Sequence, residues 1–251
     1  MINKYLSVVI PAYNEQENFQ RGVLDQVFAY LIKAPFTWEV ILVDDGSIDK
    51  TNELLNHFSK DKDGFIILKI KHGGKLKAIE EGVKAVKGEI ILFSDFDQST
   101  PISEFEKFIQ EFKTGADIVI GSRTGPKSKR INDPWLRYFR SRVLNWVIKI
   151  TLFKGIDDTQ CGFKAFKKDI AQKLFFGLKA TRLAKPVGGF MGPFDIELLF
   201  LAKKFKYNII SVPISWEYFP SKRLSVLSEP LRFLYDIFTI RKFDLLGKYK
   251  Q

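Results

Sequence analysis

The sequence predicts an α/β fold in which a mostly parallel central sheet carries helices on both faces. Short apolar runs, typical of strands buried on both sides, alternate along the chain with segments of helical periodicity. The links between them are short, and strand–helix alternation of this kind favours a parallel sheet. With 251 residues, 45% of them hydrophobic, the chain is long enough for one large α/β domain.

The apolar runs in the first half of the chain define five strands separated by helices. The strands are predicted at residues 6–10, 38–43, 65–70, 89–93 and 117–121. Pro11 is expected to end the first strand, because proline fixes φ and removes an N–H donor from the ladder. The helices are predicted from Asn14 or Glu15 to about residue 33, after a cap at Ser47 or Asp49, and at residues 78–86 and 103–113.

The second half has fewer regular patterns. Residues 127–130 are predicted to form a mobile basic loop. A helix that opens at Pro134 and ends near Phe153 has an apolar stripe typical of an ordinary amphipathic helix. The stripe consists of Leu136, Phe139, Val143, Val147 and Ile150. Another helix is predicted at residues 194–202, followed by short strands at 207–213 and 214–218.

The strand at residues 89–93 leads into the most informative stretch of the chain. Asp95 and Asp97 follow it with one residue between them, and Gln98 comes next. Alternate residues of an extended chain point the same way, so both carboxylates can aim at one point beyond the strand. Ligands bind there in open α/β sheets, and a divalent cation would relieve the repulsion between the carboxylates. Taken alone, the pattern also fits an acidic turn that only ends a strand.

Acidic residues also follow the first two strands. Tyr13 and Glu15 come after the first, and Asp44 and Asp45 end the second. Carboxylates at such places bind ribose hydroxyls or base N–H groups in dinucleotide folds, although either aspartate alone could cap a turn. The chain contains neither G-x-G-x-x-G nor G-x-x-x-x-G-K-[ST], which argues against dehydrogenases and P-loop nucleoside triphosphatases.

The charge is distributed unevenly along the chain. Residues 1–121 contain 14 Lys+Arg and 19 Asp+Glu, whereas residues 122–251 contain 26 and 10, a net charge of +16. The second half is therefore expected to meet an anionic partner, such as nucleic acid, phosphate or lipid, unless it is only a solubilising face. One cysteine, no signal peptide and no apolar run of about 18 residues predict a cytoplasmic protein, soluble or peripheral to a membrane.

Four segments of the first half together resemble family 2 glycosyltransferases of the GT-A fold. They are Val8–Glu15 (V-V-I-P-A-Y-N-E), Val43–Ser47 (V-D-D-G-S), Gly74-Lys75 with Ala78 and Gly82, and Asp95–Asp97 (D-F-D). The resemblance implies a nucleotide-sugar donor, with Mg²⁺ or Mn²⁺ held by Asp95, Asp97 and Gln98. The donor-binding residues that it implies are Pro11, Ala12, Tyr13, Glu15, Asp44, Gly46, Lys75, Asp95 and Phe96. In many members of the family a glycine follows the lysine, and a basic residue precedes the glycine of the helix. This chain has Leu76 and Glu80 at those two positions.

The second half resembles dolichyl-phosphate glucosyltransferases and related polyprenyl-phosphate glycosyltransferases. The matching segments are Asp158–Lys164 (D-T-Q-C-G-F-K), Phe194–Glu197 (F-D-I-E), Trp216 and Ser221-Lys222. The resemblance implies an inverting enzyme that moves a hexose from a UDP- or GDP-sugar to a polyprenyl phosphate. It implies a GT-A catalytic domain at residues 1–228, with a nucleotide-sugar-binding half at 1–121 and an acceptor-binding half at 122–228.

Cations of the second half are the candidates for binding the acceptor phosphate, since arginine suits bidentate phosphate contacts. They are Arg123, Lys164, Lys222 and Arg223. Arg123 is also a candidate catalytic residue, Asp158 is the first choice for a carboxylate on the acceptor side, and Asp195 is the second. Acids in the first turns of a helix also suit its dipole, so one of Asp195 and Glu197 is expected to be structural.

The last segment, residues 229–251, is predicted to be an amphipathic basic helix with a basic tail. Its composition fits a helix lying on an anionic membrane surface, and equally a helix packed on the domain. Two other functions remain open on sequence alone: a family 2 transferase acting on a sugar or protein hydroxyl, and a nucleic-acid or anionic-membrane binding module. The binding module leaves the acidic crevice unexplained, so no nucleic acid is expected as a partner.

Overall fold

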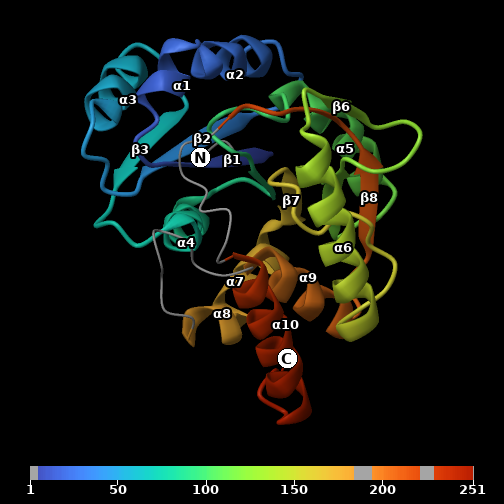
Figure 1. The fold of residues 1–251 in the computed structure, drawn as a ribbon. Helices are drawn as coiled ribbons and strands as arrows, with labels where there is room; N and C mark the ends of the chain where they lie inside the picture. Colours follow the sequence, from blue (N-terminus) through green and yellow to red (C-terminus); the bar gives the residue numbers. More distant parts are fainter. Residues whose placement is uncertain (1–4, 184–193, 221–228, 251) are drawn as a thin grey trace.

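The structure, a computed structural model, describes residues 5–183, 194–220 and 229–250. It confirms the α/β fold with a mostly parallel central sheet (Figure 1). The sheet has seven strands in the order β3-β2-β1-β4-β7-β5-β8. They are β1 (Leu6–Ala12), β2 (Trp38–Asp44), β3 (Phe65–Lys69), β4 (Ile90–Phe93), β5 (Ile118–Ser122), β7 (Lys164–Lys167) and β8 (Ile209–Pro213). β6 (Lys129–Ile131) and β9 (Ser215–Glu217) form a separate parallel pair.

The prediction that Pro11 ends the first strand was wrong by two residues. β1 continues through Pro11, which pairs with Val43 of β2, to Ala12. On the other side of β1 the pairing with β4 stops at Val9. Pro11 therefore lies beyond the last residue of β1 that pairs with β4. No hydrogen bond to β4 requires the N–H that proline lacks, so the strand tolerates Pro11.

The helices α2, α3 and α5 cover one face of the sheet, and α4, α7 and α9 cover the other. The helices in chain order are α1 (Gln16–Gln20), α2 (Val23–Leu31), α3 (Thr51–Ser59), α4 (Lys75–Ala85), η1 (Ile102–Glu104), α5 (Phe105–Lys113), α6 (Trp135–Thr151), α7 (Lys168–Gly177), α8 (Ala180–Leu183), α9 (Phe194–Lys204) and α10 (Glu229–Leu245). The helix expected from residue 14 or 15 to residue 33 is broken at Gly22, and α4 begins three residues earlier than expected, at Lys75.

The second half of the chain contributes strands that the sequence did not predict. β7 lies between β4 and β5 and is antiparallel to both. The basic loop expected to be mobile contains β6, which pairs with β9. The seven-stranded sheet is therefore built from residues on both sides of position 121.

Two helices carry apolar residues that the fold leaves exposed. In α6, most of the predicted apolar stripe faces away from the protein, and only Asn145 and Ile148 are buried. α10 is divided: Ile237 and Ile240 are buried in the core, whereas Tyr235 is exposed. No helix in the described ranges is both long and apolar enough to cross a membrane.

Candidate active site

The loops at the carboxyl ends of β1 and β2 are tied to the start of α4. The carboxylate of Asp45 accepts hydrogen bonds from the backbone N–H groups of Gly73 (2.7 Å) and Gly74 (2.8 Å). The ring of His72, in the same loop, stacks on Tyr13 with centroids 4.3 Å apart. These contacts fix where Lys75, the first residue of α4, projects.

The residues predicted to hold the base and ribose shape these loops. Asp44 is fully buried, and its oxygens accept from the backbone of Ser47 (2.9 Å) and the side chain of Asn52 (2.8 Å). Gly46 has a φ of 71°, and a Cβ there would lie 2.8 Å from the backbone nitrogen of His72. Glu15 accepts from Asn18 at 2.6 Å. Their direct contact with a nucleotide stays a prediction.

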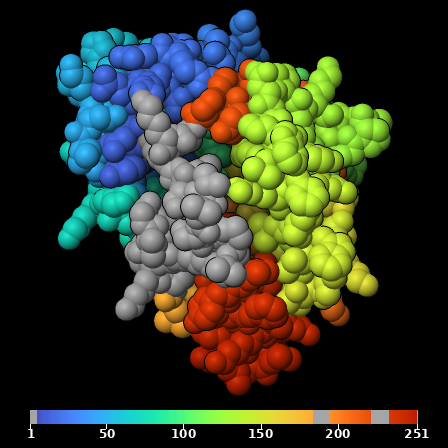
Figure 2. Space-filling view, in the orientation of Figure 1, coloured from blue at the N-terminus to red at the C-terminus, as the bar shows by residue number. Residues whose placement is uncertain are grey.

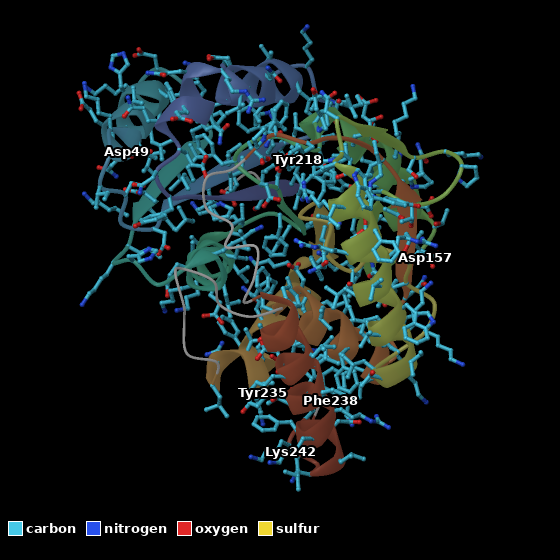
Figure 3. The ribbon with its side chains drawn as sticks, in the orientation of Figure 1. Asp49, Asp157, Tyr218, Tyr235, Phe238 and Lys242 are labelled. Carbon is cyan, nitrogen blue, oxygen red and sulfur yellow. The ribbon has the colours of Figure 1, made fainter. Side chains whose placement is uncertain are left out.

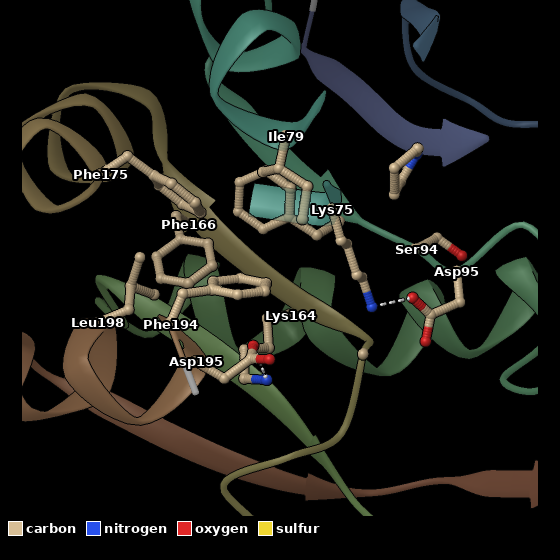
Figure 4. Close-up of a pocket in the computed structure, with 13 residues that line it drawn as sticks. Lys75, Ile79, Ser94, Asp95, Lys164, Phe166, Phe175, Phe194, Asp195 and Leu198 are labelled. Carbon is tan, nitrogen blue, oxygen red and sulfur yellow. Dashed lines mark hydrogen bonds and ion pairs between the residues drawn. The ribbon is translucent and has the colours of Figure 1, made fainter. Parts of the chain in front are cut away.

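A pocket at the end of β4 brings together ionic groups from four segments far apart in the sequence (Figure 4). Lys75 Nζ lies 2.5 Å from Asp95 Oδ1, and Lys164 Nζ lies 2.6 Å from Asp195 Oδ1. Pro11 also lines the pocket, together with an apolar floor. The floor is formed by Ile79, Phe93, Phe166, Phe175, Phe194 and Leu198. Ala12 and Phe96, also predicted donor contacts, are buried in the apolar core, and their contact with a nucleotide sugar stays a prediction.

The charges around this pocket shift one another's pKa values. Burial works against the charge on Asp95, but Lys75 outweighs it and holds the pKa of Asp95 below its usual value. For Lys75, burial is likewise outweighed, and Asp95 with Asp195 raises its pKa. For Asp97, burial and the nearby Asp95 charge both raise the pKa. Opposed pKa shifts of this kind are typical of two carboxylates that share a site and repel each other.

The donor set at Asp95, Asp97 and Gln98 fits a hard divalent cation. Oε1 of Gln98 is buried without a hydrogen-bond partner in the described structure, although its Nε2 donates to Ser94 Oγ at 3.0 Å. A carbonyl oxygen beside two carboxylates is the ligand type that Mg²⁺ and Mn²⁺ prefer. Among the described residues, no group of three or more His, Cys, Asp or Glu side chains could hold a metal ion. Any such site therefore depends on Gln98 or on the substrate.

The acceptor-side residues form two ion pairs, Arg123 with Asp158 and Lys164 with Asp195. Arg123 was expected to bind phosphate, but its guanidinium forms a bidentate pair with Asp158, at 2.8 Å for both bonds, and its backbone N–H donates to the same carboxylate at 2.9 Å. Asp158 is 2% exposed, whereas Asp195 is 25% exposed and lines the pocket. Lys164 is buried and faces the pocket as an ion pair. The predicted phosphate ligands Lys222 and Arg223 lie outside the described residues.

Sequence reasoning missed a cluster of arginines around Trp216. The guanidinium carbons of Arg123, Arg130 and Arg137 lie 5.3, 5.8 and 4.8 Å from the centre of its ring. Burial, and then the charge of Arg123, lower the pKa of both Arg130 and Arg137. Trp216 was noted in the sequence, but only the tertiary fold shows that α6 and β6 bring arginines to it.

The arginine cluster is incompletely neutralised. Arg130 Nε lies 3.2 Å from Asp133, but the geometry makes no hydrogen bond. Nε and Nη1 of Arg130 are therefore buried without a hydrogen-bond partner in the described part of the chain. Both carboxylate oxygens of Asp133 are likewise buried without a hydrogen-bond partner among the described residues. The ion pair is therefore poorly satisfied, and a further anion could accept from the Arg130 donors.

Solved structures of known proteins share the fold of this chain. Structures with the same fold include glucosyl-3-phosphoglycerate synthase of Mycobacterium tuberculosis in complex with UDP (TM-score 0.63, 19% identity, covering 95% of this chain and 80% of that one). Another is the mannosyltransferase PcManGT of Pyrobaculum calidifontis in complex with GDP-Man and Mn²⁺ (TM-score 0.58, 17% identity, covering 100% and 66%). These are GT-A glycosyltransferases, and at this identity they show the fold alone.

Proteins found by sequence comparison have higher identity to this chain than these structures do. The dolichyl-phosphate beta-glucosyltransferase of Trichomonas vaginalis is 33% identical, covering 98% of this chain and 76% of its own. The human dolichyl-phosphate beta-glucosyltransferase is 32% identical, covering 98% and 78%. Residues 7–175 match the sequence profile of the family described as Glycosyl transferase family 2. The chain therefore belongs to glycosyl transferase family 2.

Proposed function

We propose that the protein transfers a hexose, with inversion, from a UDP- or GDP-sugar to a polyprenyl phosphate at the cytoplasmic surface of a membrane. The observation that carries this proposal is the pocket in which Asp95 and Asp195 face Lys75 and Lys164 at the end of β4. It supplies carboxylates for a metal-bound diphosphate and cations for two anionic substrates in one place. The similarity to dolichyl-phosphate beta-glucosyltransferases supports the acceptor class.

The residues that would hold Mg²⁺ or Mn²⁺ are Asp95, Asp97 and Gln98. When bound, the cation neutralises the charge that develops on the leaving diphosphate. Lys75 pairs with Asp95, so it is placed to move onto the diphosphate when the carboxylate takes up another partner.

The acceptor needs holding more than it needs deprotonating. A phosphate monoester has its second pKa near ~6 and is mostly dianionic at pH 7. Its oxygen can attack the anomeric carbon from the face opposite the diphosphate: one C–O bond forms, the C–O bond to the diphosphate breaks, and the nucleoside diphosphate leaves. No proton has to be removed, so Asp195 would orient Lys164 and the sugar hydroxyls.

The arginine cluster supports phosphate binding on the acceptor side. Arg130 and Arg137 are partly buried and have lowered pKa values, caused first by burial and then by Arg123. An acceptor phosphate between them would supply the missing negative charge. Asp158, buried against Arg123, would position that arginine and the loop after β5 without touching the substrate.

Turnover with defined substrates tests the proposal. The protein is incubated with UDP-glucose, and separately with other UDP- and GDP-sugars, in the presence of Mn²⁺ and a short water-soluble prenyl phosphate. We expect a glycosyl phosphodiester whose anomeric configuration, read by NMR, is opposite to that of the donor. Transfer to sugar hydroxyls with none to prenyl phosphate would favour the hydroxyl-acceptor alternative.

A further inference from the structure

α6 has a continuous apolar face that points away from the protein. Trp135, Phe139, Val143, Trp146 and Ile150 recur at the spacing of one side of a helix. All five side chains are exposed, Trp135 by 77% and Trp146 by 64%. Sequence periodicity alone predicts that such a stripe packs inward, but in the structure the opposite side, with Asn145 and Ile148, is the buried one.

Basic residues flank this face. Arg142 and Lys149 lie along one margin and Arg140 along the other, as the helical spacing requires; Lys149 forms an ion pair with Asp157, which lies outside the helix. The whole helix, residues 135–151, contains no Asp or Glu. A face of tryptophan, phenylalanine and aliphatic residues bordered by Lys and Arg is the composition of a helix that lies in the interface of an anionic bilayer. Tryptophan favours the headgroup level, and the long basic side chains can reach outward to lipid phosphates.

The neighbouring helix extends the surface. α10 contacts α6, and the two helices lie together on the face of the molecule shown in Figure 2. Tyr235, Phe238 and Lys242, labelled in Figure 3, are exposed along α10. Its other side is buried in the core, so α10 stays folded on the domain while this margin faces outward.

The charge pattern favours a bilayer over a second copy of the chain. Two copies of α6 packed face to face would bring their basic margins together without acidic partners on either helix, and like charges at an interface cost affinity. An anionic lipid surface complements the same margins, and each basic residue near such a surface contributes about 1 kcal/mol.

We propose that the exposed face of α6, extended by α10, docks the protein on an anionic membrane surface. Arg137, on the inner side of the same helix, reaches Trp216 in the arginine cluster. Docking through α6 therefore brings the headgroup layer next to the cations proposed to hold the acceptor phosphate. The identity of that acceptor rests on the proposed function, whereas the docking surface does not.

Vesicle binding tests the surface without any turnover. Wild-type protein is sedimented with vesicles of phosphatidylcholine alone and with vesicles containing 30% phosphatidylglycerol. We expect binding to the anionic vesicles, weakened by salt, and a blue shift of tryptophan fluorescence. The double variant Trp146→Ser/Ile150→Ser should bind about tenfold or more weakly, because two large apolar side chains no longer enter the interface.

A matched control removes two exposed isoleucines elsewhere. Ile32→Ser/Ile48→Ser lies in the first half of the chain, on side chains that are also exposed, and should bind vesicles like the wild type. Transfer to a water-soluble prenyl phosphate should be equal in all three proteins, whereas transfer to an acceptor embedded in vesicles should fall only in the α6 variant. Failure of transfer to every prenyl phosphate would contradict the proposed function while leaving the binding result intact.

Three outcomes would overturn the inference. The first is equal vesicle binding by the α6 double variant and the wild type. The second is equal binding to neutral and anionic vesicles. The third is a wild-type dimer in solution that the double variant abolishes, together with no vesicle binding, which would make α6 a self-association surface.

Discussion

Gly162 passes so close to Asp95 that a Cβ atom at position 162 would lie 2.0 Å from Asp95 Oδ2. Atoms cannot coexist at that separation, so a side chain there must displace either the carboxylate or the loop. Because residue 162 is a glycine, the backbone between Cys161 and Phe163 can line the pocket directly against the carboxylate of Asp95.

The variant Gly162→Ala should therefore lose activity and keep its fold. A displacement of about 1 Å at a reacting site can reduce turnover about 100-fold, and we expect a loss of that order with little change in circular dichroism. The control is Gly177→Ala, where the new Cβ would meet Leu201 at 3.5 Å, an ordinary contact. Equal activity in both variants would show that the position of Asp95 is not critical.

Metal binding is predicted to depend on Gln98 as well as on the two aspartates. Gln98→Leu removes the buried oxygen that lacks a partner, and we expect Mn²⁺ affinity to fall at least about 10- to 100-fold, the range found when residues that support metal ligands are lost. Asp95→Ala should abolish binding. Titration calorimetry measures this without turnover, with Asp61→Ala as a control for an exposed carboxylate. Full activity in EDTA would exclude a metal requirement.

The strands and the acidic edge of the sheet could be predicted from the sequence because both depend on local patterns. Runs such as Ile90–Phe93 are short and apolar throughout, which is typical of a strand buried on both faces. The position of Asp95 and Asp97 follows from where that strand ends. Family resemblance then suggested the donor and acceptor classes, and the sequence comparisons confirm the family.

The rest depends on tertiary pairing that no local pattern encodes. β7 is four residues long and begins and ends with lysine, so it has no strand signature apart from its partners. Arg123 and Asp158 are 35 residues apart, and only the fold shows that they satisfy each other. For α6, periodicity identifies an amphipathic helix but does not tell whether protein or another medium covers its apolar side.

The pair of Arg123 and Asp158 should make a large contribution to stability. Removing one partner of a buried ion pair leaves an uncompensated charge, so we expect Asp158→Asn to lower the free energy of unfolding by about 3–5 kcal/mol. Burial opposes the charge on Asp158, but Arg123 outweighs it and holds the pKa below its ordinary value of 3.8. A carboxyl whose pKa is lower in the folded state stabilises the fold above its unfolded pKa and loses this contribution as the pH falls through the folded pKa.

Unfolding in guanidinium at several pH values measures this contribution. The free energy of unfolding of the wild type should exceed that of Asp158→Asn by a constant amount from about pH 5 to 8. This excess should become smaller below about pH 4, because only the wild type carries the titrating carboxyl group. Equal free energies of unfolding at pH 7 would show that the Arg123–Asp158 ion pair makes no net contribution to stability.

The C-terminal segment is predicted to be part of the fold. Tyr249 is buried, and its hydroxyl donates to Oε1 of the buried Glu197 at 2.7 Å. Because a hydrogen bond to a charged group contributes about 1.5–3 kcal/mol, Tyr249→Phe should lower stability by this amount. Tyr235→Phe, on an exposed side chain, should change it by less than about 0.5 kcal/mol. Deleting residues 230–251 would therefore disturb the core, so a membrane test should use point variants.

Arg137 offers the sharpest test of the acceptor site. It lies on α6 between the rings of Trp216 and Tyr218, 4.8 and 4.7 Å from their centres, and burial followed by repulsion from Arg123 lowers its pKa. A bound phosphate would offset this repulsion between the arginines. Arg137→Ala should therefore raise KM for a water-soluble prenyl phosphate about tenfold or more, the equivalent of one charged hydrogen bond, and change KM for the nucleotide sugar much less.

The matched control is Arg140→Ala, three residues further along the same helix, where the arginine is exposed. The same charge is removed from the same element, so a general electrostatic effect would alter both variants equally. We expect Arg140→Ala to retain the wild-type KM with a soluble acceptor and to weaken only vesicle binding. A rise in the nucleotide-sugar KM for Arg137→Ala, with an unchanged KM for prenyl phosphate, would assign the arginine cluster to the donor diphosphate instead.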